Sequence, residues 1–143
     1  AKLLAAECGM KVAETKTGSA GAYAHLIRVE AKGNGGSKVS AAATIFGDEQ
    51  QHPRIVRVNN YHVDALPEGY LLILVHRDAP GVIGKIGTVL GDARVNINRM
   101  TCDRLKPGET NVGVFSVDQD VTPDVLETIN KIDGILEAIR IAL

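Results

Sequence analysis

The hydrophobic positions in the second half of the chain follow first a strand period and then a helix period. Residues 70–77 form a largely apolar run of strand length, which is typical of a strand covered on both faces. After a turn at residues 78–81, apolar side chains recur at i, i+1, i+4, i+7 and i+8, the spacing of one helix face. These side chains are Val82, Ile83, Ile86, Val89 and Leu90.

The rest of this half predicts further strands and one more helix. The expected segments are a strand over 95–104, a turn over 106–109, a strand over 112–117, a helix over 122–134 and a strand over 135–142. Thr122 is a favourable N-cap, Pro123 suits the first helical position, and Gly134 is expected to end the helix. The order β-α-β-β-α-β predicts an α+β domain of the ferredoxin-like arrangement.

The first half is predicted to be rich in β-structure. Strands are expected over 11–17, 23–31, 39–46, 54–58 and 61–66. Glycines and Asn within residues 32–37 favour a hairpin between the second and third of these strands. Asn59 and Asn60 favour another hairpin between the last two.

Breaks in the pattern divide the chain into two parts. Pro67 begins an interruption, so we place the domain boundary there and expect domains of residues 1–67 and 68–143. The chain has no initiator Met and opens in an expected short helix that closes at Gly9. We therefore expect a fragment of a longer protein, with the first domain truncated at its N-terminus.

Composition limits the kinds of partner. Of the 143 residues, 45% are hydrophobic, 3% are aromatic and none is Trp, so the core has to be built from Val, Ile, Leu and Ala. Sixteen basic and seventeen acidic residues leave a net charge of −1, without the field that attracts a protein to nucleic acid or an anionic membrane. The longest apolar run, residues 71–75, is too short to span a bilayer. We expect neither nucleic acid nor a membrane as partner.

Motifs for metal, nucleotide or covalent chemistry are missing from the sequence. Cys8 and Cys102 lack CxxC spacing, so free thiols, buried or half-buried, in a reducing cytoplasm are expected. The four histidines have no metal-ligand spacing, and no G-x-S-x-G, G-x-G-x-x-G or Walker motif nominates a catalytic residue. Gly81, Gly84 and Gly87 instead indicate close approach of the predicted helix to a sheet, a second subunit or a ligand.

The turn at residues 78–84 is the first candidate binding site. It joins a strand end to a helix N-terminus, where unpaired N–H groups and the helix dipole favour a carboxylate. Asp78 at its rim can accept hydrogen bonds from an ammonium group, and Asn96 near the start of the next strand can both donate and accept. The set suits a zwitterionic amino acid. Two other interpretations stay open: Asp78 simply caps the helix, and Asn96 is a turn residue.

Basic residues of the first half form the second candidate, at Lys38, His52, Arg54 and Arg57. Charged side chains on strand edges guard against unwanted pairing, which favours a solvated edge. The alternative is a small anion site for phosphate or a carboxylated metabolite.

The second half also carries a family resemblance. Residues 76–84, His-Arg-Asp-Ala-Pro-Gly-Val-Ile-Gly, followed by Val-Asn-Ile-Asn at 95–98, resemble the signature of ACT domains, regulatory modules that bind amino acids. Residues 83–91 are more narrowly similar to the ACT domain of bacterial D-3-phosphoglycerate dehydrogenases. These NAD-dependent enzymes open serine biosynthesis.

The first half resembles the intervening domain that precedes ACT in the longer form of that enzyme. Gly47, residues 54–56 and residues 61–65 carry this resemblance. That domain is thought to bind substrate or other anions, which implies anion-binding roles for Arg54 and His62. Other basic positions of the family's site are occupied here by Tyr61, Leu66 and Ser116.

The ACT resemblance implies that L-serine binds between two ACT domains of a homodimer or larger assembly and feeds back on the enzyme. Asp78 would hold the ammonium group, and Asn96 would reach across from the partner subunit. The N–H groups of Val82 and Ile83 would take the carboxylate, and His76 would also contact the ligand. The catalytic domains and their NAD would lie before this chain, in which no cofactor is expected.

Two alternatives compete with this interpretation. One is the β-type regulatory portion of an iron–sulfur L-serine dehydratase, which shares the two-domain plan and a similar stretch over residues 96–104. The other is a dimerisation module without a ligand.

Overall fold

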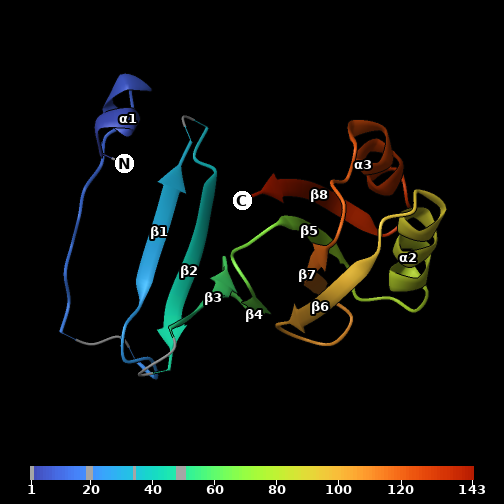
Figure 1. Cartoon of the computed structure of the whole chain (residues 1–143), viewed down its shortest axis with the longest axis horizontal. Coiled ribbons are helices and arrows are strands. Elements are labelled where there is room, and N and C mark those ends of the chain that lie inside the picture. Colours follow the sequence, from blue (N-terminus) through green and yellow to red (C-terminus); the bar gives the residue numbers. More distant parts are fainter. Residues whose placement is uncertain (1, 19–20, 34, 48–50) are drawn as a thin grey trace.

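The computed structural model describes residues 2–18, 21–33, 35–47 and 51–143, which form two antiparallel sheets lying side by side (Figure 1). The first sheet has the strand order β1-β2-β3-β4. Its elements, after a short helix α1 (Lys2–Glu7), are β1 (Ile27–Lys32), β2 (Lys38–Phe46), β3 (His52–Val58) and β4 (Tyr61–Ala65). Both predicted hairpins are confirmed, since β1 pairs with β2 and β3 with β4.

The second sheet has the order β6-β7-β5-β8, with every neighbouring pair antiparallel. Its elements are β5 (Tyr70–Arg77), α2 (Val82–Asp92), β6 (Ile97–Arg104), β7 (Thr110–Val117), α3 (Pro123–Asn130) and β8 (Ile135–Ala142). The predicted order β-α-β-β-α-β and the α+β, ferredoxin-like fold are therefore confirmed.

Helices α2 and α3 cover one face of the second sheet (Figure 1). Leu72 and Leu74 of β5 are fully buried beneath them together with Ile86 of α2 and Ile129 of α3. The apolar positions of α2 thus face the sheet as the helix period predicts. Among the described residues, no helix is long and apolar enough to cross a membrane.

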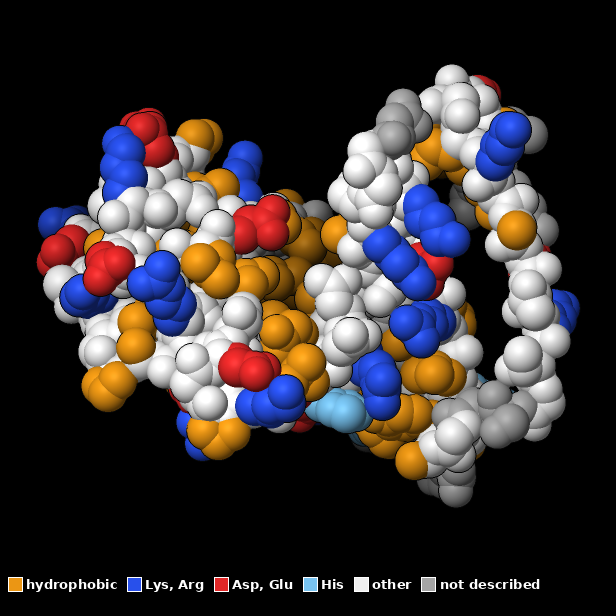
Figure 2. All heavy atoms as spheres, turned by 180° about the vertical axis from the view of Figure 1, so that it is seen from behind, with side chains coloured by type: hydrophobic (Ala, Val, Ile, Leu, Met, Phe, Trp, Pro, Cys, Tyr) orange, Lys and Arg blue, Asp and Glu red, His pale blue; other side chains and the backbone are white. Residues whose placement is uncertain are grey.

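Strand β4 covers part of the opposite face. Val63 and Ala65 of β4 pack against Val112 and Val114 of β7, and Ile73 and Val75 of β5 join this second cluster. Figure 2 shows hydrophobic side chains gathered where the two sheets meet. Strand β5 is therefore covered on both faces, as its continuous apolar run predicts.

Polar contacts along β6 reinforce the contact between the sheets. The His62 N–H of β4 donates to Asp103 Oδ2 at 2.7 Å, and the Asp64 N–H points to Thr101 Oγ1 at 3.5 Å. Side chains of β6 thus accept hydrogen bonds from the main chain of β4. Strand β4 is an edge strand of the first sheet, so within the described part of the chain these N–H groups have no neighbouring strand to pair with.

Two of the strands expected in the first half are wrong in existence or extent. Residues 11–17 form no strand, because all of them are exposed and their weak alternation has no buried face to stabilise it. The strand expected over 23–31 begins only at Ile27. Both cysteines are free, as expected, and exposed. The expectation of a buried or half-buried thiol is therefore wrong for Cys8, whereas partial burial of the Cys102 sulfur raises the pKa of that thiol.

Gly134 provides a test of how closely α2 docks. Its φ of +99° is in the left-handed region, and a Cβ added there would lie 2.9 Å from Val82 Cγ2 at the start of α2. Backbone strain and overpacking together should make Gly134→Ala lower the free energy of unfolding by about 2–4 kcal/mol. Gly91→Ala is the matched control, since it meets no atom within 4 Å, and it should raise stability by about 0.5–1 kcal/mol. Urea unfolding measures both, and an unchanged midpoint for Gly134→Ala would contradict this packing.

Candidate functional site

The loop between β5 and α2 presents the first candidate site. Gly81 is the N-cap of α2 with a φ of 85°, and no side chain caps the helix. The interpretation of Asp78 as a helix cap is therefore wrong. The N–H groups of Val82 and Ile83 belong to the first turn and have no partner within the helix, so this end of α2 can accept an anion.

The Asp78 carboxylate instead ties this loop to the β6–β7 hairpin. Arg104 Nη1 donates to Asp78 Oδ2 at 2.5 Å, and the Gly108 N–H donates to the same oxygen at 3.1 Å. The Asp78 N–H in turn donates to the Glu109 carbonyl at 2.8 Å. Asp78 is thus fixed in position at the rim of the site, with its side chain 21% exposed.

These contacts lower the pKa of the Asp78 carboxyl. The hydrogen bond from Arg104 is the largest cause, followed by the one from the Gly108 N–H, and the Asn111 side chain also contributes. A carboxyl whose pKa is lowered by folding adds stability above its ordinary pKa, and that stability is lost as pH falls through the lowered value.

Two buried polar side chains lie at the same end of the sheet. His76 and Asn111 are Cα partners in the β5–β7 register, and they are only 2% and 9% exposed. His76 Nδ1 donates to the Arg77 carbonyl at 2.8 Å, which leaves Nε2 as an acceptor. Neither His76 Nε2 nor Asn111 Oδ1 has a hydrogen-bond partner among the described residues. Near the Asp78 carboxylate, two buried hydrogen-bond acceptors are therefore unsatisfied, and a bound ligand could donate to them.

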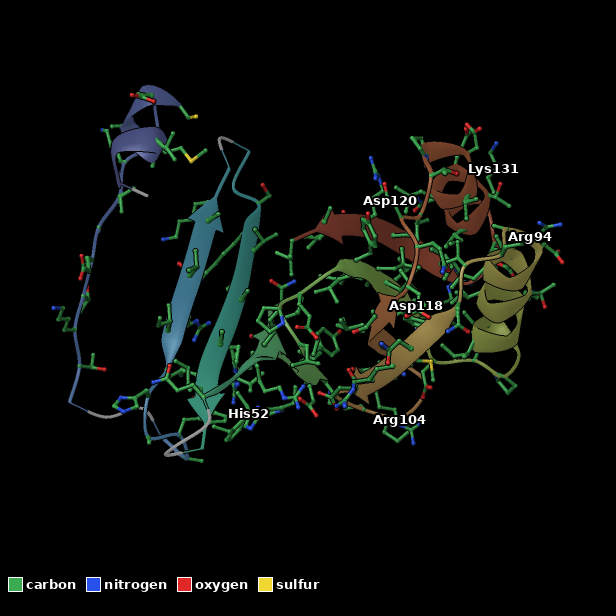
Figure 3. The ribbon with its side chains drawn as sticks, viewed as in Figure 1. His52, Arg94, Arg104, Asp118, Asp120 and Lys131 are labelled. Atoms are coloured by element: carbon green, nitrogen blue, oxygen red, sulfur yellow. The ribbon has the colours of Figure 1, made fainter. Side chains whose placement is uncertain are left out.

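Asn96 lies at the opposite end of β6. Its Nδ2 donates to Asp118 Oδ2 at 2.6 Å, and its N–H donates to Gln119 Oε1 at 2.8 Å. Strand β6 is roughly 25 Å long from its eight residues, and Arg104, the partner of Asp78, ends it. Figure 3 shows Arg104 and Asp118 well apart. One copy of the chain therefore does not bring Asn96 and Asp78 into one site.

The glycines of α2 are not explained by packing within this chain. In the part of the chain that the structure describes, no atom lies within 4 Å of a Cβ added at Gly84 or Gly87. Of the three reasons predicted for them, close approach to the chain's own sheet is therefore wrong, and a second subunit or a ligand remains.

The second candidate site lies on the first sheet, over which Lys and Arg side chains gather in Figure 2. Three of its basic residues contact a carboxylate or a histidine, and Lys38 Nζ lies 2.7 Å from Glu30 Oε2. Arg54 Nε lies 3.5 Å from Asp64 Oδ1, and Arg57 Nη2 donates to His62 Nε2 at 2.9 Å. Asp103 is also within 3.9 Å of His62. Anion binding at Arg54 and His62 stays a prediction, although acidic neighbours weaken the field there.

A shallow cavity of about 460 Å³ lies where residues 66–70 meet the second sheet, and Arg99 in its wall shares the Asp64 carboxylate with Arg54 of the second candidate site. Glu68, Tyr70, Arg99 and Asp118 are among its lining residues. Its wall mixes acidic, basic and aromatic side chains, and Asp118 connects it to Asn96.

Sequence reasoning missed Arg104 and Asn111 as neighbours of Asp78. The β-α-β-β-α-β order implies that the strand ending at Arg104 runs parallel to β5, and that β7 between them starts at this end. The topology could therefore have predicted that the end of β6 and the start of β7 lie near the Asp78 loop. Which residues contact the loop depends on the strand register, which the sequence pattern does not determine.

Comparison with known proteins identifies the class of the second half: residues 69–134 match the model of the ACT domain family, and this part of the chain is an ACT domain. The whole chain is 38% identical to D-3-phosphoglycerate dehydrogenase of Archaeoglobus fulgidus and 33% identical to that of Synechocystis, of which it covers 27% and 25%. It is 38% identical over 87% of its length to the Mycobacterium tuberculosis enzyme, covering 24% of it. The chain thus spans about a quarter of the length of these curated relatives.

Replacing Arg104 tests the electrostatics of the site. Arg104→Gln should raise the pKa of the Asp78 carboxyl toward its ordinary value, because the largest cause of the shift is removed. NMR titration of the carboxyl carbons measures the pKa of Asp78. Arg140→Gln is the control, because Arg140 donates to Asp120 at 2.6 and 2.8 Å outside the site. An Asp78 pKa that does not rise in Arg104→Gln would mean that the hydrogen bond is not formed in solution.

Proposed function

We propose that this chain is the regulatory region of an NAD-dependent D-3-phosphoglycerate dehydrogenase, and that its ACT domain binds L-serine as a feedback signal. The observation that carries the proposal is the pairing of an acidic acceptor, Asp78, with the uncapped N-terminus of α2 in an ACT domain. Dehydrogenase chemistry and NAD would belong to other parts of the enzyme, in the cytoplasm.

The chemistry of the site supports a zwitterionic ligand with a hydroxyl group. The Asp78 carboxylate attracts an ammonium group, and the N–H groups of Val82 and Ile83 attract a carboxylate. The buried acceptors His76 Nε2 and Asn111 Oδ1 lack donors, and the ligand's hydroxyl or ammonium group would supply them. L-serine carries all three groups.

A second copy would complete the site. Strand β6 is an edge of its sheet, and an antiparallel pair of β6 strands would bring the start of one beside the end of the other. Asn96 of the partner subunit would then approach the Asp78 loop. Such a homodimer would also place a partner near Gly84 and Gly87, where an added Cβ has no close neighbour among the described residues.

Residues 1–67 would be the intervening domain of the same enzyme, with residues 68–143 as its ACT domain. Arg54 and His62 are the residues proposed to bind an anion there. The relatives described above are all D-3-phosphoglycerate dehydrogenases, which favours this parent over an iron–sulfur L-serine dehydratase.

Calorimetric titration of the chain with L-serine tests the ligand. Asp78→Asn should weaken L-serine binding by about tenfold or more, because hydrogen bonds to charged groups contribute about 1.5–3 kcal/mol. Asp120→Asn is the matched control, since Asp120 also binds an arginine but lies outside the site, and it should bind as the unmodified chain does. Absence of heat at millimolar L-serine would refute the serine assignment, and glycine and phosphate titrations in parallel would reveal a different ligand.

Mixing two variants that bind L-serine poorly tests whether the binding site is shared between subunits. Asp78→Ala and Asn96→Ala chains should each bind L-serine poorly, whereas an equimolar mixture should recover about a quarter of the sites, because half of randomly paired dimers are mixed and each has one intact site. Calorimetry after refolding the mixture counts the sites. If the mixture recovers none while the unmodified chain binds, Asn96 and Asp78 do not share a site across subunits.

A further inference from the structure

We propose that Arg104 competes with the ligand's ammonium group for Asp78, so that ligand binding requires release of the Arg104–Asp78 ion pair. The proposal rests on the proposed function, because it concerns the same site. It adds a regulatory element, a guanidinium from the chain itself that sets how tightly an amine-bearing ligand is held.

The geometry supports the competition directly. Arg104 Nη1 lies 2.5 Å from Asp78 Oδ2, the distance of a charge-assisted hydrogen bond. An ammonium group bound to the same carboxylate would stand within a few ångströms of the guanidinium. Two cations then share one negative charge, and their repulsion disfavours simultaneous binding.

Arg104 is the partner of Asp78 that can leave. Its side chain is 52% exposed and is carried by the last residue of β6. The other partners are fixed: Gly108 donates through its backbone, and Asn111 is 91% buried within β7. Among the ion pairs of the described residues, Arg104 has no carboxylate other than Asp78, so its release leads to solvent.

The energetic effect is modest because the pair is partly exposed. Such surface ion pairs shift equilibria by about two- to fivefold. Arg104 therefore weakens ligand binding without abolishing it. The effect applies to ligands that bring a positive charge to Asp78, and it does not apply to an acid that lacks an ammonium group.

The test titrates L-serine calorimetrically into the unmodified chain and three variants. Arg104→Gln should lower the Kd by about two- to fivefold, whereas Arg104→Lys, which keeps the charge, should remain close to the unmodified chain. Arg140→Gln, which removes an arginine from a comparable ion pair outside the site, should change nothing.

A second ligand separates competition from a general structural effect. L-lactate has a carboxylate and a hydroxyl but no ammonium group, so Arg104→Gln should not improve its binding. Equal gains for both ligands would overturn the proposal. Weaker L-serine binding by Arg104→Gln would also overturn it and would make Arg104 a carboxylate ligand, and an unchanged Kd would overturn it as well. Failure of the unmodified chain to bind L-serine would instead refute the proposed function.

Discussion

The structure depends on the burial of strand β5 on both faces. Even-numbered residues such as Leu72 and Leu74 pack under the helices, and odd-numbered ones such as Ile73 and Val75 join the cluster beneath β4. A strand covered in this way exposes only its ends to ligands. The loop that leaves β5 at Asp78 and enters α2 is therefore where backbone donors and a carboxylate become accessible together.

The same constraint explains how much of the fold the sequence could predict. The bounds of β5 and β8 match the expected ranges, because each segment has a buried face that fixes its period. The strands of the first sheet were harder to predict. All six residues of β1 are exposed, so its periodicity carries little information about where it begins, and residues 11–17 alternate without being a strand.

The sequence predicted Asp78 as a site residue but did not predict the residues that contact it. Asp78 stood out because it lies between a strand end and a helix start, which are both local features. Arg104 and Asn111 reach it from two other strands, and only the pairing register of β5, β6 and β7 decides that contact. Asn96 is a different case: the family resemblance implied that it acts from the partner subunit, and within one chain it lies at the other end of β6 from Arg104.

Strand β6 connects the candidate site to the contact between the sheets. Side chains alternate along a strand, so neighbouring residues point to opposite faces. Arg104 binds Asp78 on the helix side, while Asp103 accepts the His62 N–H of β4 on the other. Release of Arg104 by a ligand would therefore act at the same strand end whose opposite face contacts the first sheet. Coupling between the ACT domain and the first sheet requires an element whose conformation is influenced by contacts with each of them. The end of β6 meets this condition, because the Asp78 loop and β4 both contact it.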